Sequence, residues 1–514
     1  MMGILRTILF AATGLAATGA AFAQQTDSAS LFRTQREHAS PVAALAATAY
    51  ATPALRSEAF AGSLSEISVG YEMRREEKAL EQQKGDGGDF GRFSAGSYKH
   101  ISGKGTVWGD AGYLRGAKRN VVWNASLDYD LVFPYVVADS IGGDLTSEEY
   151  TFGGGYGHRS GRYTWALEAG ARALHEYRDS DPRIRNVAID IDAGAGASVR
   201  MGNYRLGLSA ALRVYKQSGS QIQYAHSAGE KGVYHLSGLG SHYAGFEGNA
   251  NSQTRYRGSG YGLTLALVPD AGRGGLHLAA GYEYLHIEKE LPGSADLVLQ
   301  KVVPRSFHAE AAWLRGSGNG LRWGVALKAR YDYRRGDEGI VDDNNSSQGS
   351  GTLGFLTLFE YSALQGRAEA VFGVEAAGHA WYVCPWGEYR RRTSDYLYPA
   401  QNMEFTRAGG GVDFRCVLQR RSLLLRLEAG GGYTAGLDSG LTLPVADLAA
   451  PLVRMVQYDY GRLRQDAATF RLGLRADYAL RRRMSLFLAA DYGGGLYGDN
   501  TAAHHARVAC GIAF

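Results

Sequence analysis

The sequence predicts an all-β fold, a transmembrane antiparallel β-barrel of about 18 strands, with a range of about 16 to 20. Three observations predict it: an export signal at the N-terminus, apolar residues alternating with small or polar ones along most of the chain, and an apolar side without charges on each alternating run. About 19 runs can be counted, and because single-chain bacterial barrels have even strand numbers, one run is split or merged.

The composition excludes several classes of protein. The chain has 514 residues, of which 70 are Gly, and 45% are hydrophobic. Abundant glycine without a three-residue period, beside ordinary hydrophobicity, excludes collagen, a coiled coil and a disordered chain. The 55 basic and 51 acidic residues nearly balance, so no nucleic-acid partner is expected. Three cysteines without metal-ligand spacing predict neither a disulfide framework nor a metal site.

Residues 1–23 have the pattern of a secretory signal peptide. Arg6 precedes an apolar, small-residue stretch, and an Ala-Phe-Ala motif ends at Ala23, where cleavage is expected. No later run of about 18 or more apolar residues could form a membrane helix. We therefore expect an exported protein of the outer membrane, in which residues 24–63 form a periplasmic or plug segment and residues 64–514 form the transmembrane barrel with long loops.

Alternation is clearest between Val187 and Tyr215. Apolar side chains occupy every second position on both sides of a turn at 201–203, and such strict alternation indicates two strands of a hairpin. Similar pairs follow to the C-terminus. Longer connections are expected at 217–253, 334–350, 382–402 and 435–466.

The two faces of these strands differ in a way that suits a membrane barrel. A basic residue at the lipid midplane costs about 2–4 kcal/mol, so the charge-free faces are expected to contact lipid. Tyr and Trp near the ends of the runs predict an interfacial girdle. The other face carries small residues and charges of both signs, which favours a braced lumen or a narrow polar conduit. The predicted lumen-lining charges are Asp190, Asp192, Arg205, Arg213, Arg330, Asp332, Glu369, Glu375, Arg426, Glu428, Arg471, Arg475 and Asp477.

The last strand alternates through Val508, Cys510 and Ile512 and ends at Phe514. It resembles the C-terminal insertion signal of bacterial outer-membrane barrels, which implies that the barrel-assembly machinery reads Phe514. Residues 97–109 and 120–124 resemble an uncharacterised family of Gram-negative outer-membrane barrels, which implies no known activity.

The fragment Thr52-Pro53-Ala54-Leu55 is similar to the segment that precedes the barrel in fatty-acid-transporter-like proteins, with Thr52 where that family has Asn. The segment 24–63 is too short for the plug domain of an active transporter. Energy-coupled import by this chain alone is therefore not expected.

Candidate catalytic groups are scattered. The histidines considered are His308, His379, His504 and His505, and neither G-x-S-x-G nor H-E-x-x-H occurs. We expect no catalytic, cofactor-binding or metal-binding residues. Cys416 and Cys510 fall on the lipid-facing alternation. Cys384 is expected in or near a long loop, within an aromatic cluster at 381–386 that suits either a flat ligand such as a sugar or the interfacial girdle.

The favoured function is non-enzymatic: an outer-membrane barrel that passes or binds a small solute, or the membrane component of a larger assembly. One alternative is an outer-membrane hydrolase with its active site in the extracellular loops. Another is a surface scaffold or adhesin that binds a partner through its long loops. The expected partners are outer-membrane lipid, the barrel-assembly machinery during insertion, and a small solute or a protein.

Overall fold

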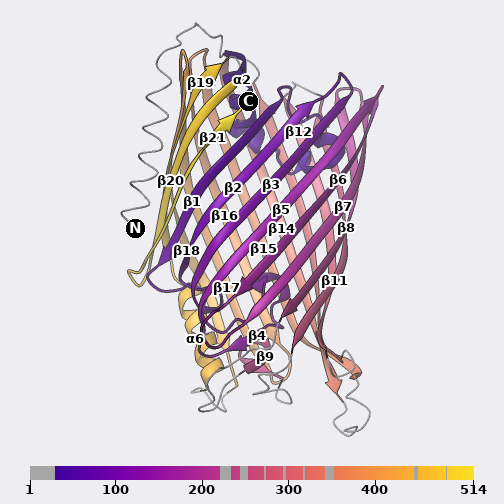
Figure 1. Ribbon diagram of the computed structural model, residues 1–514, viewed down its shortest axis with the longest axis vertical. Helices are drawn as coiled ribbons and strands as arrows, with labels where there is room; N and C mark the ends of the chain where they lie inside the picture. The colour runs from indigo at the N-terminus through magenta and orange to yellow at the C-terminus, as the bar shows by residue number, and fades with distance from the viewer. Residues whose placement is uncertain are drawn as a thin grey trace.

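The chain forms a closed antiparallel barrel of 18 strands (Figure 1). The ring closes because β1 pairs with β21, from Glu66 opposite Ala513 to Glu76 opposite Ala503, so the sheet has no free edge. The predicted fold class and strand number are confirmed. The computed structural model describes residues 29–219, 233–243, 253–270, 274–292, 297–316, 319–341, 352–444, 450–481 and 483–514. The predicted signal peptide lies outside these residues.

Each barrel strand pairs with its neighbour along the chain, apart from connections that hold additional elements. The barrel strands are β1 (Leu64–Glu76), β2 (Gly87–His100), β3 (Gly105–Val121), β5 (Gly143–Ser160), β6 (Tyr163–Tyr177), β7 (Arg185–Met201), β8 (Tyr204–Gly219), β11 (Thr254–Pro269), β12 (Gly275–Leu291), β13 (Leu297–Arg315), β14 (Gly320–Val341), β15 (Thr352–Glu375), β16 (His379–Tyr396), β17 (Gln401–Arg420), β18 (Leu423–Thr442), β19 (Ala467–Arg481), β20 (Met484–Tyr497) and β21 (Ala502–Ala513).

The remaining elements are short. A separate three-stranded sheet contains β4 (Val137–Asp139), β9 (Val233–Gly238) and β10 (Ser241–His242). The helices are α2 (Ala29–His38), α3 (Pro41–Ala44), η1 (Ala49–Ala51), α4 (Pro53–Arg56), η2 (Gln82–Lys84), α5 (Tyr129–Val132) and α6 (Pro451–Leu463). Within the described ranges, none of these helices is long and apolar enough to cross a membrane.

The apolar face of each strand forms the outer surface of the barrel. On β19, Phe470, Leu472 and Leu474 are 44%, 55% and 45% exposed, and no described part of the chain forms a second layer over them. Neighbouring positions such as Arg471 and Arg475 point into the lumen, since successive side chains of a strand face opposite ways. A closed sheet with an apolar outside satisfies every backbone group within lipid, so the chain is a transmembrane barrel.

The two ends of the barrel differ. The start of β1 and the end of β21 lie at the same end of the barrel, which we call the terminal end (Figure 1, top). The connections there are as short as 161–162 and 421–422. The opposite end, here the loop end, has longer connections, such as 122–142 and 443–466.

The predicted loops at 334–350 and 382–402 are wrong in extent. β14 continues to Val341, and β16 and β17 fill most of the second range, leaving 397–400 as the connection. Strands such as β15, with 24 residues, are much longer than the roughly 9–11 residues needed to cross a bilayer. In the loop-end parts of β14 and β16, at 334–338 and 388–395, charges replace the apolar alternation on which the prediction depended.

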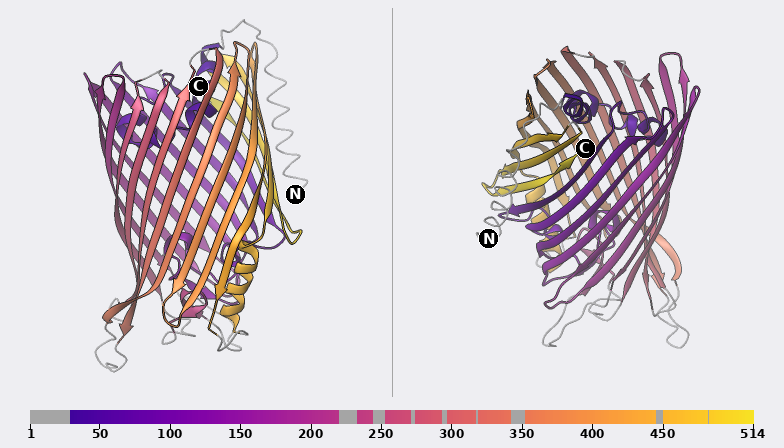
Figure 2. Two further views of the ribbon diagram at one scale, coloured as in Figure 1. Left: turned by 180° about the vertical axis from the view of Figure 1, so that it is seen from behind. Right: turned by 45° about the horizontal axis from the view of Figure 1, so that its top comes forward.

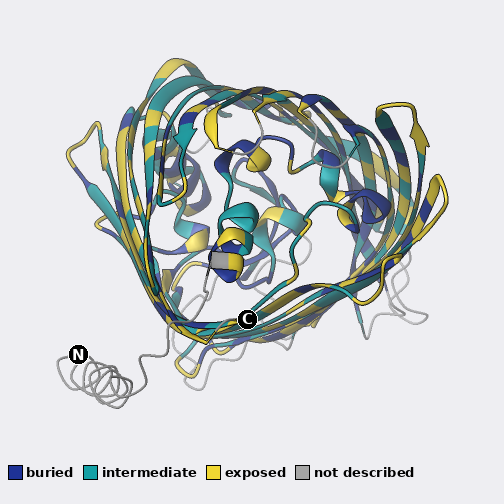
Figure 3. Cartoon of the chain, turned by 90° about the horizontal axis from the view of Figure 1, so that it is seen from above, coloured by how far each residue is buried: buried dark blue, intermediate teal, exposed yellow. Residues whose placement is uncertain are grey.

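The lumen is filled at both ends (Figures 2 and 3). Helices α2, α3 and α4 lie inside the ring near the terminal end, and α5 and β4 lie inside near the loop end. One apolar cluster joins Phe32, Val42 and Leu45 of the N-terminal segment to barrel residues such as Val371 and Leu424. The N-terminal segment therefore packs against the inner wall of the barrel.

Candidate functional site

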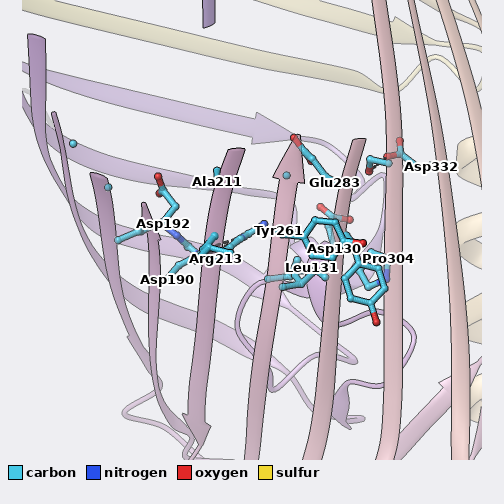
Figure 4. Close-up of a pocket in the computed structure, with 18 of the residues that line it drawn as sticks. Asp130, Leu131, Asp190, Asp192, Ala211, Arg213, Tyr261, Glu283, Pro304 and Asp332 are labelled. Atoms are coloured by element: carbon cyan, nitrogen blue, oxygen red, sulfur yellow. Dashed lines mark hydrogen bonds and ion pairs between the residues drawn. The ribbon is translucent and has the colours of Figure 1, made fainter. Parts of the chain in front are cut away.

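A chamber of about 890 Å³ lies in the lumen between these two fillings (Figure 4). Arg56 of α4 lines it on the side of the terminal end, and Tyr129, Leu131 and Phe133 line it on the side of the loop end. Its wall comes from inward-facing residues of β3 and β5 through β8 and from β11 to β16. The chamber is therefore built by more than half of the ring.

Many charged side chains meet in the chamber because every second residue of each strand faces the lumen, and the charged residues of the strands occupy these positions. Arg172 of β6 is the most connected group. Its guanidinium donates to both carboxylate oxygens of Asp128, at 2.9 and 2.7 Å, and lies 3.5 Å from Glu149 and 3.7 Å from Asp190. Asp128 precedes α5, so Arg172 connects the loop-end filling to the barrel wall.

The predicted lumen charges lie inside the barrel, in three groups. Asp190, Asp192, Arg213, Arg330 and Asp332 line the chamber. Within this group, Arg213 pairs with Asp190 at 2.6 Å and Arg330 pairs with Asp332 at 2.9 Å.

A second group holds the N-terminal segment. Arg205 pairs with Glu58 at 2.9 Å, Glu375 pairs with Arg36 at 3.7 Å, and Asp477 accepts a hydrogen bond from Gln35 at 3.1 Å. The third group braces neighbouring strands, and its pairs are Glu369 with Lys328, Arg426 with Asp477, Glu428 with Arg415 and Arg471, and Arg475 with Glu66 and Asp477.

Three carboxylates of the chamber have no ion pair with any residue in the described part of the chain. They are Asp110 of β3, Asp192 of β7 and Glu283 of β12. Glu168 of β6 is only weakly neutralised, since its nearest cation, Arg56, is 3.9 Å away. The wall formed by β3, β6, β7 and β12 therefore carries negative charge without ion pairs. Arg305 of β13 and Arg334 of β14 line the same chamber and likewise have no ion pair with a described residue.

The sequence prediction did not include Asp110 or Glu283. Their position in the alternating pattern could have indicated that they face the lumen. Asp110 lies two residues after Trp108, and Glu283 lies between two tyrosines, so each occupies a polar position of an alternating run.

The predicted catalytic candidates do not converge. His308 lines a second cavity of about 450 Å³, His379 begins β16, and His504 stacks on Tyr492 at the outer surface. No group of three metal-ligand side chains occurs among the residues that the structure describes. Among the described residues, the arrangement consists of ion pairs and unpaired charges, without an assembled nucleophile and base.

The aromatic cluster at 381–386 is divided between two faces. Trp381 is 42% exposed on the outer surface, whereas Trp386 faces the lumen under the guanidinium of Arg367, 4.7 Å from the ring centre. Cys384 also faces the lumen, in a cavity of about 180 Å³, so the prediction that it lies in or near a loop is wrong. The reason is that β16 continues through it.

The loop end is closed by a packed apolar core. Tyr135, Tyr256 and Phe359 are almost fully buried in it, together with Leu452 and Val456 of α6. α6 also carries Asp459, whose carboxylate accepts hydrogen bonds from the side chain of Gln83 at 2.7 Å and the backbone of Gln82 at 3.3 Å.

Burial raises the pKa of Asp459 from 3.8 to about 7, against the opposing effect of its hydrogen bonds. Between these two values the folded state binds more protons than the unfolded state, so the stability of the docked helix is expected to fall as pH rises, by at most about 1.4 kcal/mol per pH unit, and to level off above about pH 7. Amide hydrogen exchange of residues 451–463 across this range measures the effect. Asp459→Asn should abolish the slope, and Asp438→Asn at an exposed position should keep it.

Comparison with solved structures finds membrane receptors. The alcaligin outer membrane receptor FauA from Bordetella pertussis is 9% identical, with a TM-score of 0.35, over 86% of this chain and 76% of the receptor. The ferric preacinetobactin receptor BauA from Acinetobacter baumannii is 9% identical, with a TM-score of 0.37, over 88% and 79%. Similarities at this level carry no argument about a solute.

No curated protein matches the sequence. The resemblance to an uncharacterised family of outer-membrane barrels is confirmed, because a model described as a family of unknown function (DUF6850) matches residues 53–514. The match begins at the first residue of α4 and covers the whole barrel. The chain belongs to this family.

Proposed function

We propose that this outer-membrane barrel binds and passes a small polar solute through its central chamber, with preference for a solute that carries a positive charge. The observation that carries the proposal is the chamber of about 890 Å³ with Asp110, Asp192 and Glu283 unpaired on its wall. A cation entering from water would restore the missing ion pairs, whereas an anion would meet like charge. Of the two chamber guanidinium groups without an ion pair among the described residues, that of Arg334 donates to the backbone carbonyls of Asp130 and Phe133, which leaves Arg305 as the cation that opposes the three carboxylates.

The orientation follows from the connections. Outer-membrane barrels have short periplasmic turns and longer extracellular loops. The terminal end would then face the periplasm, and the loop end would face the outside. The N-terminal segment at the terminal end and the packed elements at the loop end both lie on the solute's route. Each must therefore move aside for a solute to pass.

No observation on the described residues favours the hydrolase or the scaffold. His308, His379 and the pair His504 and His505 lie on β13, β16 and β21 and do not converge, so the described residues offer no assembled hydrolase site. A loop-based scaffold would need free loops, but 382–402 is mostly strand, and the described residues of 217–253 include β9, which packs into the loop-end core through Leu236.

Charge selectivity tests the proposal. Purified protein in planar bilayers, under a potassium chloride gradient, is expected to show a reversal potential on the cation-selective side. The triple variant Asp110→Asn, Asp192→Asn, Glu283→Gln should lose most of this selectivity, since it removes the uncompensated charge of the chamber. Asp438→Asn removes an exposed carboxylate and should change nothing. Absence of conductance under all conditions, or selectivity that survives the triple variant, would contradict the proposal.

A further inference from the structure

The N-terminal segment, residues 29–63, occupies the lumen at the terminal end without joining the barrel sheet. It contacts the wall through three separate apolar clusters, centred on Phe32 and Leu45, on Leu55, and on Ala54 beside Trp108. The segment is therefore a distinct body inside the ring, connected to β1 by the residues that follow α4.

Glycines of the wall form the seat for α4. A Cβ atom added at Gly207 of β8 would lie 2.8 Å from Cγ of Leu55, and one added at Gly157 of β5 would overlap Ser57. A Cβ added at Gly324 of β14 would lie 2.8 Å from Leu45. The wall thus receives the segment on bare backbone, so no side chain at these positions interlocks with it.

Polar contacts fasten the segment around its rim. The side chain of Gln35 donates to Asp477 at 3.1 Å and to Ser485 at 3.0 Å, and the guanidinium of Arg415 donates to the carbonyl of Ala39 at 2.9 Å. Arg205 pairs with Glu58 at 2.9 Å. Water can replace contacts of this kind when the segment leaves.

We propose that residues 29–63 are a removable plug that closes the lumen at the terminal end and leaves its glycine seat to let a solute pass. The inference rests on the proposed function for its purpose. The position of the plug can be tested without a solute, because the plug covers Cys384. Pro41, Ala44 and Leu45 line the same small cavity as this thiol. Cys384 is therefore a native reporter of plug position that needs no solute.

The first experiment measures the labelling rate of Cys384 by a polyethylene-glycol maleimide in detergent. Cys416 and Cys510 are first changed to Ala so that one thiol remains. Gly207→Leu, which drives a side chain into Leu55, is expected to raise the rate by at least about tenfold, since overpacking strain shifts equilibria by this order. Gly96→Leu is the matched control, because Gly96 also faces the lumen and a Cβ there meets nothing within 4 Å.

Should Gly207→Leu impair folding, a plug-side variant replaces it. Gln35→Ala with Glu58→Gln removes two fastenings without touching the barrel and should also raise the rate. The inference is overturned if Cys384 is labelled at the same rate in the wild type, in Gly207→Leu and in the plug-side variant. It is also overturned if Gly96→Leu raises the rate as much as Gly207→Leu does.

The second experiment locks the plug. Leu55→Cys with Gly207→Cys, in a background with Cys384→Ser, Cys416→Ala and Cys510→Ala, puts two Cβ atoms within disulfide reach, about 3.5–4.5 Å. The oxidised protein should lose ion passage in planar bilayers, and reductant should restore it. Passage that is equal in both states overturns the plug inference. Absence of passage in both states, with Cys384 labelling behaving as expected, instead overturns the proposed function and leaves the plug in place.

Discussion

Replacing Arg172 with methionine is expected to release the α5 region from the barrel wall and to lower the free energy of unfolding by about 3–5 kcal/mol. The guanidinium neutralises Asp128 through two hydrogen bonds, and all three partner carboxylates lie within 3.7 Å of it. Without it, Asp128 keeps only the hydroxyl of Tyr215, at 3.0 Å, and is left as an unpaired charge in a crowded lumen. Denaturant unfolding in detergent measures the loss, and hydrogen exchange of residues 122–142 locates it.

Two further variants separate charge from packing. Adding Asp128→Asn to Arg172→Met removes the stranded charge and should recover most of the stability. Arg162→Met, at an exposed turn where the side chain contacts Tyr163, should have almost no effect. Equal destabilisation by the single and double variants would show that packing, and not charge, explains the role of Arg172.

A charge on the outer surface should have an effect that depends on depth. Leu474→Arg, near the middle of β19, is expected to lower the free energy of folding into lipid vesicles by about 2–4 kcal/mol, because the guanidinium would have to enter hydrocarbon. Leu480→Arg lies on the same face near the end of the strand, where the cost should be only about 0–1 kcal/mol. Equilibrium unfolding from vesicles compares the two.

The outcome decides how the barrel sits in the membrane. Equal costs of about 2–4 kcal/mol at positions 474 and 480 would mean that both lie within the hydrocarbon. A larger cost at 480 would place the hydrocarbon closer to the terminal end. Only a negligible cost at both positions would contradict the assignment of the apolar stripe to the bilayer.

The sequence was sufficient for the barrel itself because strand side chains alternate with period two. That rule assigns Leu472 and Leu474 to one face and Arg471 and Arg475 to the other before any contact is known. It also placed Asp190 and Arg213 in the lumen. It failed where charges interrupt the apolar alternation, as in residues 334–341 of β14, and at Cys384, which lies within β16 although a loop was expected there.

Which charges pair was decided by register and side-chain direction. The ladder places Asp192 directly opposite Arg213, yet the ion pair forms with Asp190, at 2.6 Å. Side chains lean along a strand, so the diagonal neighbour can be the closer one. This choice leaves Asp192 facing the chamber unpaired, and no property of the sequence pattern distinguishes the two aspartates.

The sequence by itself determined the strands, their two faces and the membrane as their surroundings, since these depend on residues close together in the chain. The tertiary structure alone decided what fills the lumen. Gln35 meets Asp477 across 442 positions of sequence, and Asp110 and Glu283 share one chamber although they lie on β3 and β12. Such meetings depend on how the ring closes and on which segments fold into it, and local periodicity carries no information about either.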